Sequence, residues 1–156
     1  MKIELWLVAK TEGFIQPGFE MYEKRMKHYT QFEVVVFPES RKKGTASPAQ
    51  VKDAEAQAIL QKLNDSDYLV LLDEKGKELS STGFADYINK LMVSGRKRII
   101  FLIGGAYGFD EGIYKRANDK LSLSKMTFSH QVIRLLFMEQ LYRGFTIINN
   151  EPYHHA

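Results

Sequence analysis

Four short apolar runs recur along the chain, and they limit what it can fold into more than any other feature. Each run has five or six residues and is almost uninterrupted in apolar character, which is typical of strands buried on both faces of a sheet. The stretches between them carry apolar residues at the three- and four-residue spacing of helices. This alternation predicts an α/β fold in which helices flank both faces of a parallel sheet. The runs cover residues 3–8, 32–37, 68–72 and 99–103.

The composition predicts one globular domain spanning residues 1–156. Hydrophobic residues make up 44% of the chain and charged residues 26%, and no repeat or linker divides it. No run approaches the roughly 18 apolar residues that a membrane span requires, and the N-terminal residues are expected to form a strand and not a signal peptide. The absence of cysteine excludes disulfides and thiolate catalysis, and it fits a cytoplasmic protein. The net charge of +3 permits a nucleic-acid partner without requiring one.

Four segments between and after these runs shape the expectations for the site. Residues 39–47 are polar and basic and are expected to form an exposed loop, and residues 73–77 are expected to form a turn. Residues 121–131, LSLSKMTFSHQ, match neither a strand nor a helix. The helix predicted over residues 130–142 is apolar around nearly its whole circumference, so either its own domain or a partner must bury it.

A pair of glycines, Gly104 and Gly105, directly follows the fourth apolar run. Ligands of open α/β sheets bind beyond the carboxyl ends of the strands, and paired glycines let backbone N–H groups approach a ligand closely. A tight strand-to-helix turn is the alternative interpretation. Leu72, which ends the third run, and the segment LSLSKMTF are expected to complete a pocket here. Its apolar walls, amides and hydroxyls suit an uncharged heterocycle such as adenine better than a polyphosphate.

Sequence motifs exclude several other enzyme classes. The stretch GGAYGFDEG lacks the spacing of a dinucleotide-binding fingerprint, no Gly-Lys-Ser/Thr of a P-loop is present, and G-x-S-x-G is absent. The four histidines lack the spacing of a zinc-protease helix, and the pair His154–His155 is too short to indicate a metal site. No metal is therefore expected.

Several motifs in order along the chain resemble those of one enzyme family. Over essentially its whole length the chain resembles the small SPOUT-class methyltransferases, of the RlmH type, that methylate N3 of a pseudouridine in 23S ribosomal RNA. The combination of LSLSKMTF, EQLYR and PYH is the most specific part of this resemblance. The motifs are the N-terminal MKI strand, YEKR at 22–25, LDEKGK at 72–77, IGGAYGF at 103–109, LSLSKMTFSHQ at 121–131, EQLYRGF at 139–145 and PYH at 152–154.

The resemblance implies a fold and a cofactor that periodicity alone does not reach. It implies a C-terminal trefoil knot, a homodimer, and S-adenosylmethionine bound in a bent conformation by the segment that threads the knot. The cofactor contacts implied by the resemblance and the glycine pair together form one set of expected cofactor residues. They are Leu72, Gly104, Gly105, Leu123, Ser124, Lys125, Met126, Thr127 and Phe128.

Five residues are candidates for work on the RNA base. His130, Tyr153 and His154 are expected to accept or orient the proton of N3, and Arg134 and Arg143 to stabilise an anionic base or a phosphate. Two alternatives stay open. A histidine at a helix N-terminus can satisfy its hydrogen bonds locally, and an arginine near a helix C-terminus can simply favour the helix dipole.

The chain departs from the family pattern at two places. Ser129 stands where the family commonly has proline, which is expected to soften that turn, and the tail ends His154-His155-Ala156 without the usual basic residue. The expected partner is 23S rRNA on an assembled 70S ribosome, because a net charge of +3 is low for tight binding to free RNA. The alternatives are a SPOUT methyltransferase of tRNA or another RNA, and a knotted protein that binds RNA or cofactor without catalysis.

Overall fold

A five-stranded parallel sheet with the strand order β2-β1-β4-β3-β5 forms the centre of the protein. The structure is a computed structural model, and it describes residues 1–39 and 47–155. The strands are β1 (Lys2–Val8), β2 (Gln31–Phe37), β3 (Tyr68–Glu78), β4 (Arg98–Ile103) and β5 (Asp119–Ser122). The helices are α1 (Gln16–Met26), α2 (Pro48–Lys62), α3 (Ser81–Val93), α4 (Glu111–Arg116) and α5 (Val132–Ile148).

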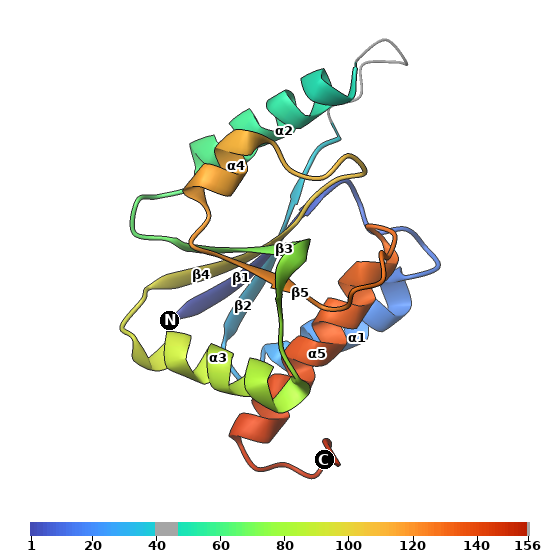
Figure 1. Ribbon diagram of the computed structural model, residues 1–156. Coiled ribbons are helices and arrows are strands. Elements are labelled where there is room, and N and C mark those ends of the chain that lie inside the picture. The colour runs from blue at the N-terminus through green and yellow to red at the C-terminus, as the bar shows by residue number, and fades with distance from the viewer. Residues whose placement is uncertain (40–46, 156) are drawn as a thin grey trace.

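Helices cover both faces of the sheet, as the uninterrupted apolar runs predict. Helices α2 and α4 lie on one face, and α1, α3 and α5 lie on the other (Figure 1). Two neighbouring residues of β1 illustrate the consequence: Leu5 packs into one core and Trp6 into the other, and both are 0% exposed. A strand buried on both faces has no polar side to alternate with its apolar one. The α/β prediction is therefore confirmed, while the trefoil knot and the assignment of all 156 residues to a single domain remain predictions.

Strand β3 is longer than predicted, and the prediction of a turn over residues 73–77 is wrong. β5 pairs with β3 at Leu72 and again at Lys77 and Glu78, so the polar residues between form an irregularity inside one strand. Gly76 makes this possible, because a Cβ there would lie 2.6 Å from the backbone nitrogen of Leu121. The polar composition of this stretch gave no sign that a strand continues through it.

The segment LSLSKMTFSHQ begins inside the sheet. Leu121 and Ser122 are buried as the last two residues of β5. A four-residue strand without alternation is too short to recognise from periodicity. The remainder of the segment leads over the carboxyl edge of the sheet to α5.

Helix α5 extends beyond the predicted residue 142 to Ile148. It ends where Asn150 takes a left-handed conformation (φ 56°), and the Glu151 N–H donates to the Thr146 carbonyl at 2.8 Å. α5 lies beside α1 and α3, which bury Phe137, Met138 and Leu141 completely. Its own domain thus buries most of this apolar helix.

Candidate functional site

A cavity of about 660 Å³ lies beyond the carboxyl ends of the adjacent strands β3, β4 and β5. This is where open α/β sheets bind ligands, and the volume is in the range of small-molecule sites. Eight of the nine expected cofactor residues line it. They are Leu72, Gly104, Gly105, Leu123, Ser124, Met126, Thr127 and Phe128. Lys125 is not among the lining residues, and it is exposed.

The glycine pair is packed closely against neighbouring side chains. A Cβ on Gly104 would lie 3.0 Å from the Phe109 ring, which itself lines the cavity. A Cβ on Gly105 would lie 3.0 Å from the carboxylate of Glu55, a residue of α2. Burial, and to a lesser degree the charge of Glu39, raises the pKa of this Glu55 carboxyl. A larger residue at either position would therefore force Phe109 or Glu55 to shift.

Serine hydroxyls shape the segment that follows β5. The Ser122 hydroxyl donates to the Ser124 carbonyl at 2.7 Å, and the Ser124 hydroxyl accepts from the Met126 N–H at 3.0 Å. The Thr127 hydroxyl donates to the Glu74 carboxylate at 2.7 Å, which joins this segment to the irregular part of β3. The serines of this segment thus stabilise local turns, and its leucines supply part of the apolar wall of the cavity.

Ser129 supports the turn that it was expected to soften. Its hydroxyl accepts from the Val132 N–H at 3.1 Å, and its carbonyl accepts from the Ile133 N–H at 3.1 Å. The hydroxyl satisfies one of the free N–H groups at the start of α5, which proline has no side-chain acceptor to do.

Asp73 is an acidic residue that lines the cavity. Its Oδ2 is buried, and although no hydrogen bond of standard geometry reaches that oxygen, the carboxylate interacts with the hydroxyl of Tyr114, which also lines the cavity. The apolar walls and this carboxylate fit a nucleoside-containing methyl donor such as S-adenosylmethionine.

The structure separates the five candidate catalytic residues into three places. His130 lines the cavity. Arg134 is 0% exposed, and its guanidinium donates to the carbonyls of Val8, Ala9 and His130 and to the Thr11 hydroxyl at 2.6–3.1 Å. Burial lowers the pKa of Arg134 to about 10. These contacts use its donors to fasten α5 to the end of β1, so the geometry gives Arg134 a structural role in place of contact with the base or a phosphate.

The other three candidates form one cluster around a residue that sequence reasoning missed. Glu139 accepts from Arg143 Nε at 3.1 Å and from the Tyr153 hydroxyl at 3.2 Å. Arg143 Nη1 contacts His154 Nδ1 at 3.0 Å, and its guanidinium lies 4.8 Å from the centre of the Tyr153 ring. The only signal for Glu139 was its i, i+4 spacing to Arg143 within EQLYR.

The electrostatics of the cluster fix the protonation of two groups. The hydrogen bond with Glu139 raises the pKa of Arg143. The hydrogen bond with Tyr22, followed by burial and the charge of Glu139, raises the pKa of the Tyr153 hydroxyl above its usual value. Tyr153 therefore remains a phenol, and Arg143 remains a cation.

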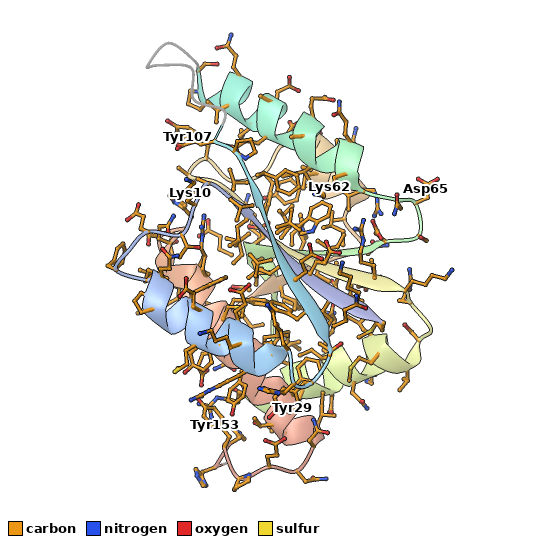
Figure 2. The ribbon with its side chains drawn as sticks, turned by 180° about the vertical axis from the view of Figure 1, so that it is seen from behind. Lys10, Tyr29, Lys62, Asp65, Tyr107 and Tyr153 are labelled. Carbon is orange, nitrogen blue, oxygen red and sulfur yellow. The ribbon has the colours of Figure 1, made fainter. Side chains whose placement is uncertain are left out.

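The cluster and the cavity are apart in one chain. None of Glu139, Arg143, Tyr153 and His154 lines the cavity. Tyr153 lies near Tyr29 at the end of the molecule opposite Tyr107, a cavity residue (Figure 2). In one chain the tail cluster therefore lies outside the lining of this cavity.

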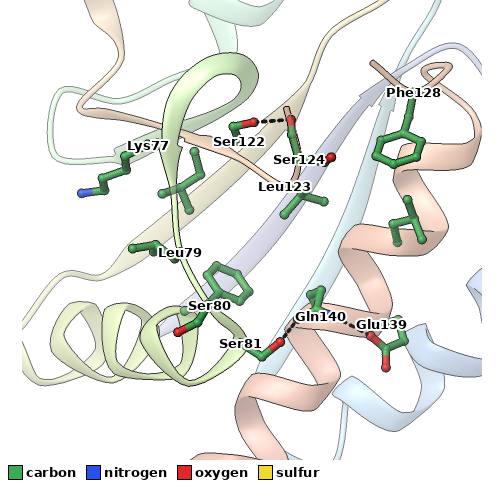
Figure 3. A pocket seen from close by; sticks show the side chains of 13 residues that line it. Lys77, Leu79, Ser80, Ser81, Ser122, Leu123, Ser124, Phe128, Glu139 and Gln140 are labelled. Carbon is green, nitrogen blue, oxygen red and sulfur yellow. Dashed lines mark hydrogen bonds between the residues drawn. The ribbon is translucent and has the colours of Figure 1, made fainter. Parts of the chain in front are cut away.

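A second cavity of about 450 Å³ shares a wall with the first. Leu121–Ser124 and Phe128 line both. In Figure 3, Phe128 and Leu123 lie at one end of this second cavity and Ser81 and Gln140 at the other, where Gln140 bonds both Ser81 and Glu139. The segment after β5 is thus in contact with both cavities, and Glu139 links the second one to the tail cluster.

Neither a membrane span nor a metal-binding cluster is present among the described residues. No helix within residues 1–39 and 47–155 has both the length and the apolar character to cross a bilayer. The same residues hold no group of three or more histidine or acidic side chains placed to bind a metal ion.

Comparison with known proteins assigns the family. A family model described as "Predicted SPOUT methyltransferase" matches residues 1–154. The chain is 51% identical to the Ribosomal RNA large subunit methyltransferase H of Parabacteroides distasonis, and the match covers 99% of each chain. It is 50% identical to the protein of that name from Christiangramia forsetii and 47% identical to the one from Bacteroides thetaiotaomicron, again over 99% of each chain. The chain belongs to the SPOUT methyltransferase family.

Proposed function

We propose that the protein uses S-adenosylmethionine to methylate N3 of a pseudouridine in 23S rRNA of the bacterial cytoplasm. The observation that carries the proposal is the cavity beyond β3, β4 and β5, which is lined by eight of the nine residues expected to hold the methyl donor. Full-length relatives at about 50% identity are named as methyltransferases of the large-subunit ribosomal RNA, which favours this substrate over tRNA.

Different residues of the cavity hold different parts of the methyl donor. Leu72 and Leu123 offer apolar walls to the adenine, and the backbone at Gly104 can approach it closely. The Asp73 carboxylate is the group of the cavity proposed to accept a hydrogen bond from the ligand. When bound, S-adenosylmethionine supplies a methyl group on a sulfonium, which is a good leaving group, so the chief task of the protein is alignment.

The tail cluster acts on the base. N3 carries a proton at neutral pH, and this proton must leave before the nitrogen lone pair can attack. Arg143 is a cation, so its charge stabilises the anionic base, and the Tyr153 phenol does so when its one O–H turns from Glu139 to the base. Because Arg143 has only donors, His154 Nδ1 accepts from it, and a neutral His154 carries its proton on Nε2. The cluster therefore favours the deprotonated base electrostatically, and the proton passes to water.

A homodimer would bring the tail cluster and the cavity together. In one chain none of the residues of the tail cluster lines the cavity. The tail of one subunit would then serve the cavity of the other. His130, at the rim of the cavity, would contact the base from the subunit that holds the methyl donor.

Two measurements test this proposal. Calorimetry should show S-adenosylmethionine binding to the wild-type protein and about tenfold weaker binding to Asp73→Asn, which keeps the shape of the side chain and removes its charge. Transfer of a labelled methyl group should occur to 70S ribosomes lacking the modification and be much weaker with the isolated 23S hairpin. Transfer to tRNA instead would favour the alternative substrate, and binding without transfer to any RNA would favour a non-catalytic protein.

A further inference from the structure

Arg25, in the last turn of α1, is held between two tyrosine rings. Its guanidinium carbon lies 5.6 Å from the ring centre of Tyr22 and 5.1 Å from that of Tyr142. Both distances are within the range of cation–π attraction. The stacking restricts a side chain that otherwise has large rotamer freedom, so little entropy remains to be lost on binding a ligand.

Arg25 differs from most arginines in the described residues because its hydrogen-bond donors are unused. Arg98 and Arg143 pair with carboxylates, and Arg116 and Arg134 donate to backbone carbonyls. Within residues 1–39 and 47–155, Arg25 has no hydrogen bond or ion pair. A half-buried, oriented guanidinium without a carboxylate is a binding group for an external anion.

The position of Arg25 places that binding group beside the tail cluster. The ring of Tyr142 contacts the ring of Tyr153 edge-on at 4.8 Å between centres. The hydroxyl of Tyr22 lies 3.5 Å from the Tyr153 hydroxyl. Arg25 is therefore separated by a single aromatic layer from a residue that we assign to the target base.

We propose that Arg25 binds a backbone phosphate of the rRNA next to the target nucleotide and so positions the base. The inference rests on the proposed function. RNA is the polyanion that such a site meets, and the planar guanidinium matches two phosphate oxygens. The tyrosine rings present Arg25 at a fixed place relative to Tyr153, so one contact sets the register of the nucleotide.

Arg96 provides a matched control. Its guanidinium stacks on one tyrosine ring, that of Tyr68, at 4.8 Å, and it also has no hydrogen bond or ion pair to a described residue. It precedes β4, and among the described residues none of its contacts is with Tyr22, Tyr142 or the tail cluster. Arg25→Gln and Arg96→Gln remove the same charge from a stacked arginine at two different places.

The experiment measures the binding of unmodified ribosomes as a function of salt. We expect Arg25→Gln to weaken binding about tenfold and to reduce the slope of log K against log salt by roughly 0.7–0.9, the contribution of one phosphate. Arg25→Lys should keep the slope and lose part of the affinity, because the charge stays and the two-pronged contact does not. Affinity for S-adenosylmethionine should be unchanged in all variants.

Two results would overturn the inference. One is an unchanged slope in Arg25→Gln while the wild type methylates the ribosome normally. The other is an equal loss of slope in Arg96→Gln, which would mean that any surface arginine has this effect. If the wild-type protein fails to methylate ribosomes at all, the proposed function is wrong, and that outcome is separate from either of these. Thermal unfolding checks that each variant is folded, and Arg25→Lys serves as the folded reference if Arg25→Gln is unstable.

Discussion

Arg143 Nη1 and His154 Nδ1 lie 3.0 Å apart, within a cluster that also includes Glu139 and Tyr153. A guanidinium can only donate, so the imidazole nitrogen facing it must accept. The other imidazole nitrogen, Nε2, then bears the proton and points its donor away from Arg143. In the proposed function, His154 then donates a hydrogen bond to the ligand and does not act as a general base.

This tautomer predicts different results for two replacements of His154. His154→Ala should lower kcat roughly 100-fold, the cost of removing one donor to a developing anion. His154→Gln should retain a substantial part of the activity, because its amide nitrogen can donate in place of Nε2. Steady-state kinetics with ribosomes as substrate measure both. Equal loss in the two variants would indicate that His154 takes the proton.

The tail predicts a separation of binding from turnover. Truncation after Pro152 removes Tyr153 and His154 from the cluster and leaves the cavity residues untouched. We expect S-adenosylmethionine to bind with unchanged affinity and methyl transfer to be lost. Truncation after His154 is the control, and it should keep activity because it removes only the last two residues. Turnover by the shorter protein would show that the tail is not part of the active site.

Gly104→Val tests the position of the cofactor pocket. The new side chain would start 3.0 Å from the ring of Phe109, which lines the cavity, so the ring or the strand end must shift. We expect affinity for S-adenosylmethionine to fall by about 100-fold, equivalent to roughly 2.7 kcal/mol. The control is Gly13→Val, because a Cβ at Gly13 meets no atom within 4 Å. Calorimetry that finds normal affinity in Gly104→Val would place the pocket elsewhere.

Sequence patterns predicted the sheet well and its irregular edge poorly. The four apolar runs became β1, β2, the first half of β3 and β4, because burial on both faces leaves a strong local signature. β5 and the extension of β3 left no such signature in the sequence. Their pairing depends on the close approach of the two backbones at Gly76, which no pattern of apolar residues reveals. The basic run at residues 41–43 lies outside the described residues.

The candidate site shows the same division between local and long-range information. The cavity residues follow strand ends and could be grouped from the chain alone. The burial of Arg134 could not, because it depends on carbonyls of Val8 and Ala9 far away in sequence. Glu139 was missed for a similar reason, since its role comes from the return of the tail to α5.

Asp67 predicts how stability depends on pH. Burial alone would raise the pKa of this carboxyl, but hydrogen bonds from Arg98 (Nε to Oδ1, 2.8 Å) and from the Asn64 N–H (2.7 Å) outweigh it and lower the pKa. A lowered folded-state pKa stabilises the fold above the unfolded value of about 3.9, and this stability is lost as pH falls through the folded value.

The corresponding variant is Asp67→Asn. It should lower the free energy of unfolding by about 2 kcal/mol at pH 7, and the difference from wild type should shrink below about pH 4. Urea denaturation at pH 7 and pH 3 measures both values. A difference that is the same at the two pH values would mean that the charge of Asp67 contributes nothing.

Mass spectrometry of 23S rRNA from a strain that lacks this gene tests the proposed function most directly. The proposed function predicts the loss of one N3-methyl group from one pseudouridine, restored by the wild-type gene and not by the gene truncated after Pro152. An unchanged 23S rRNA methylation profile in the deletion strain would contradict it.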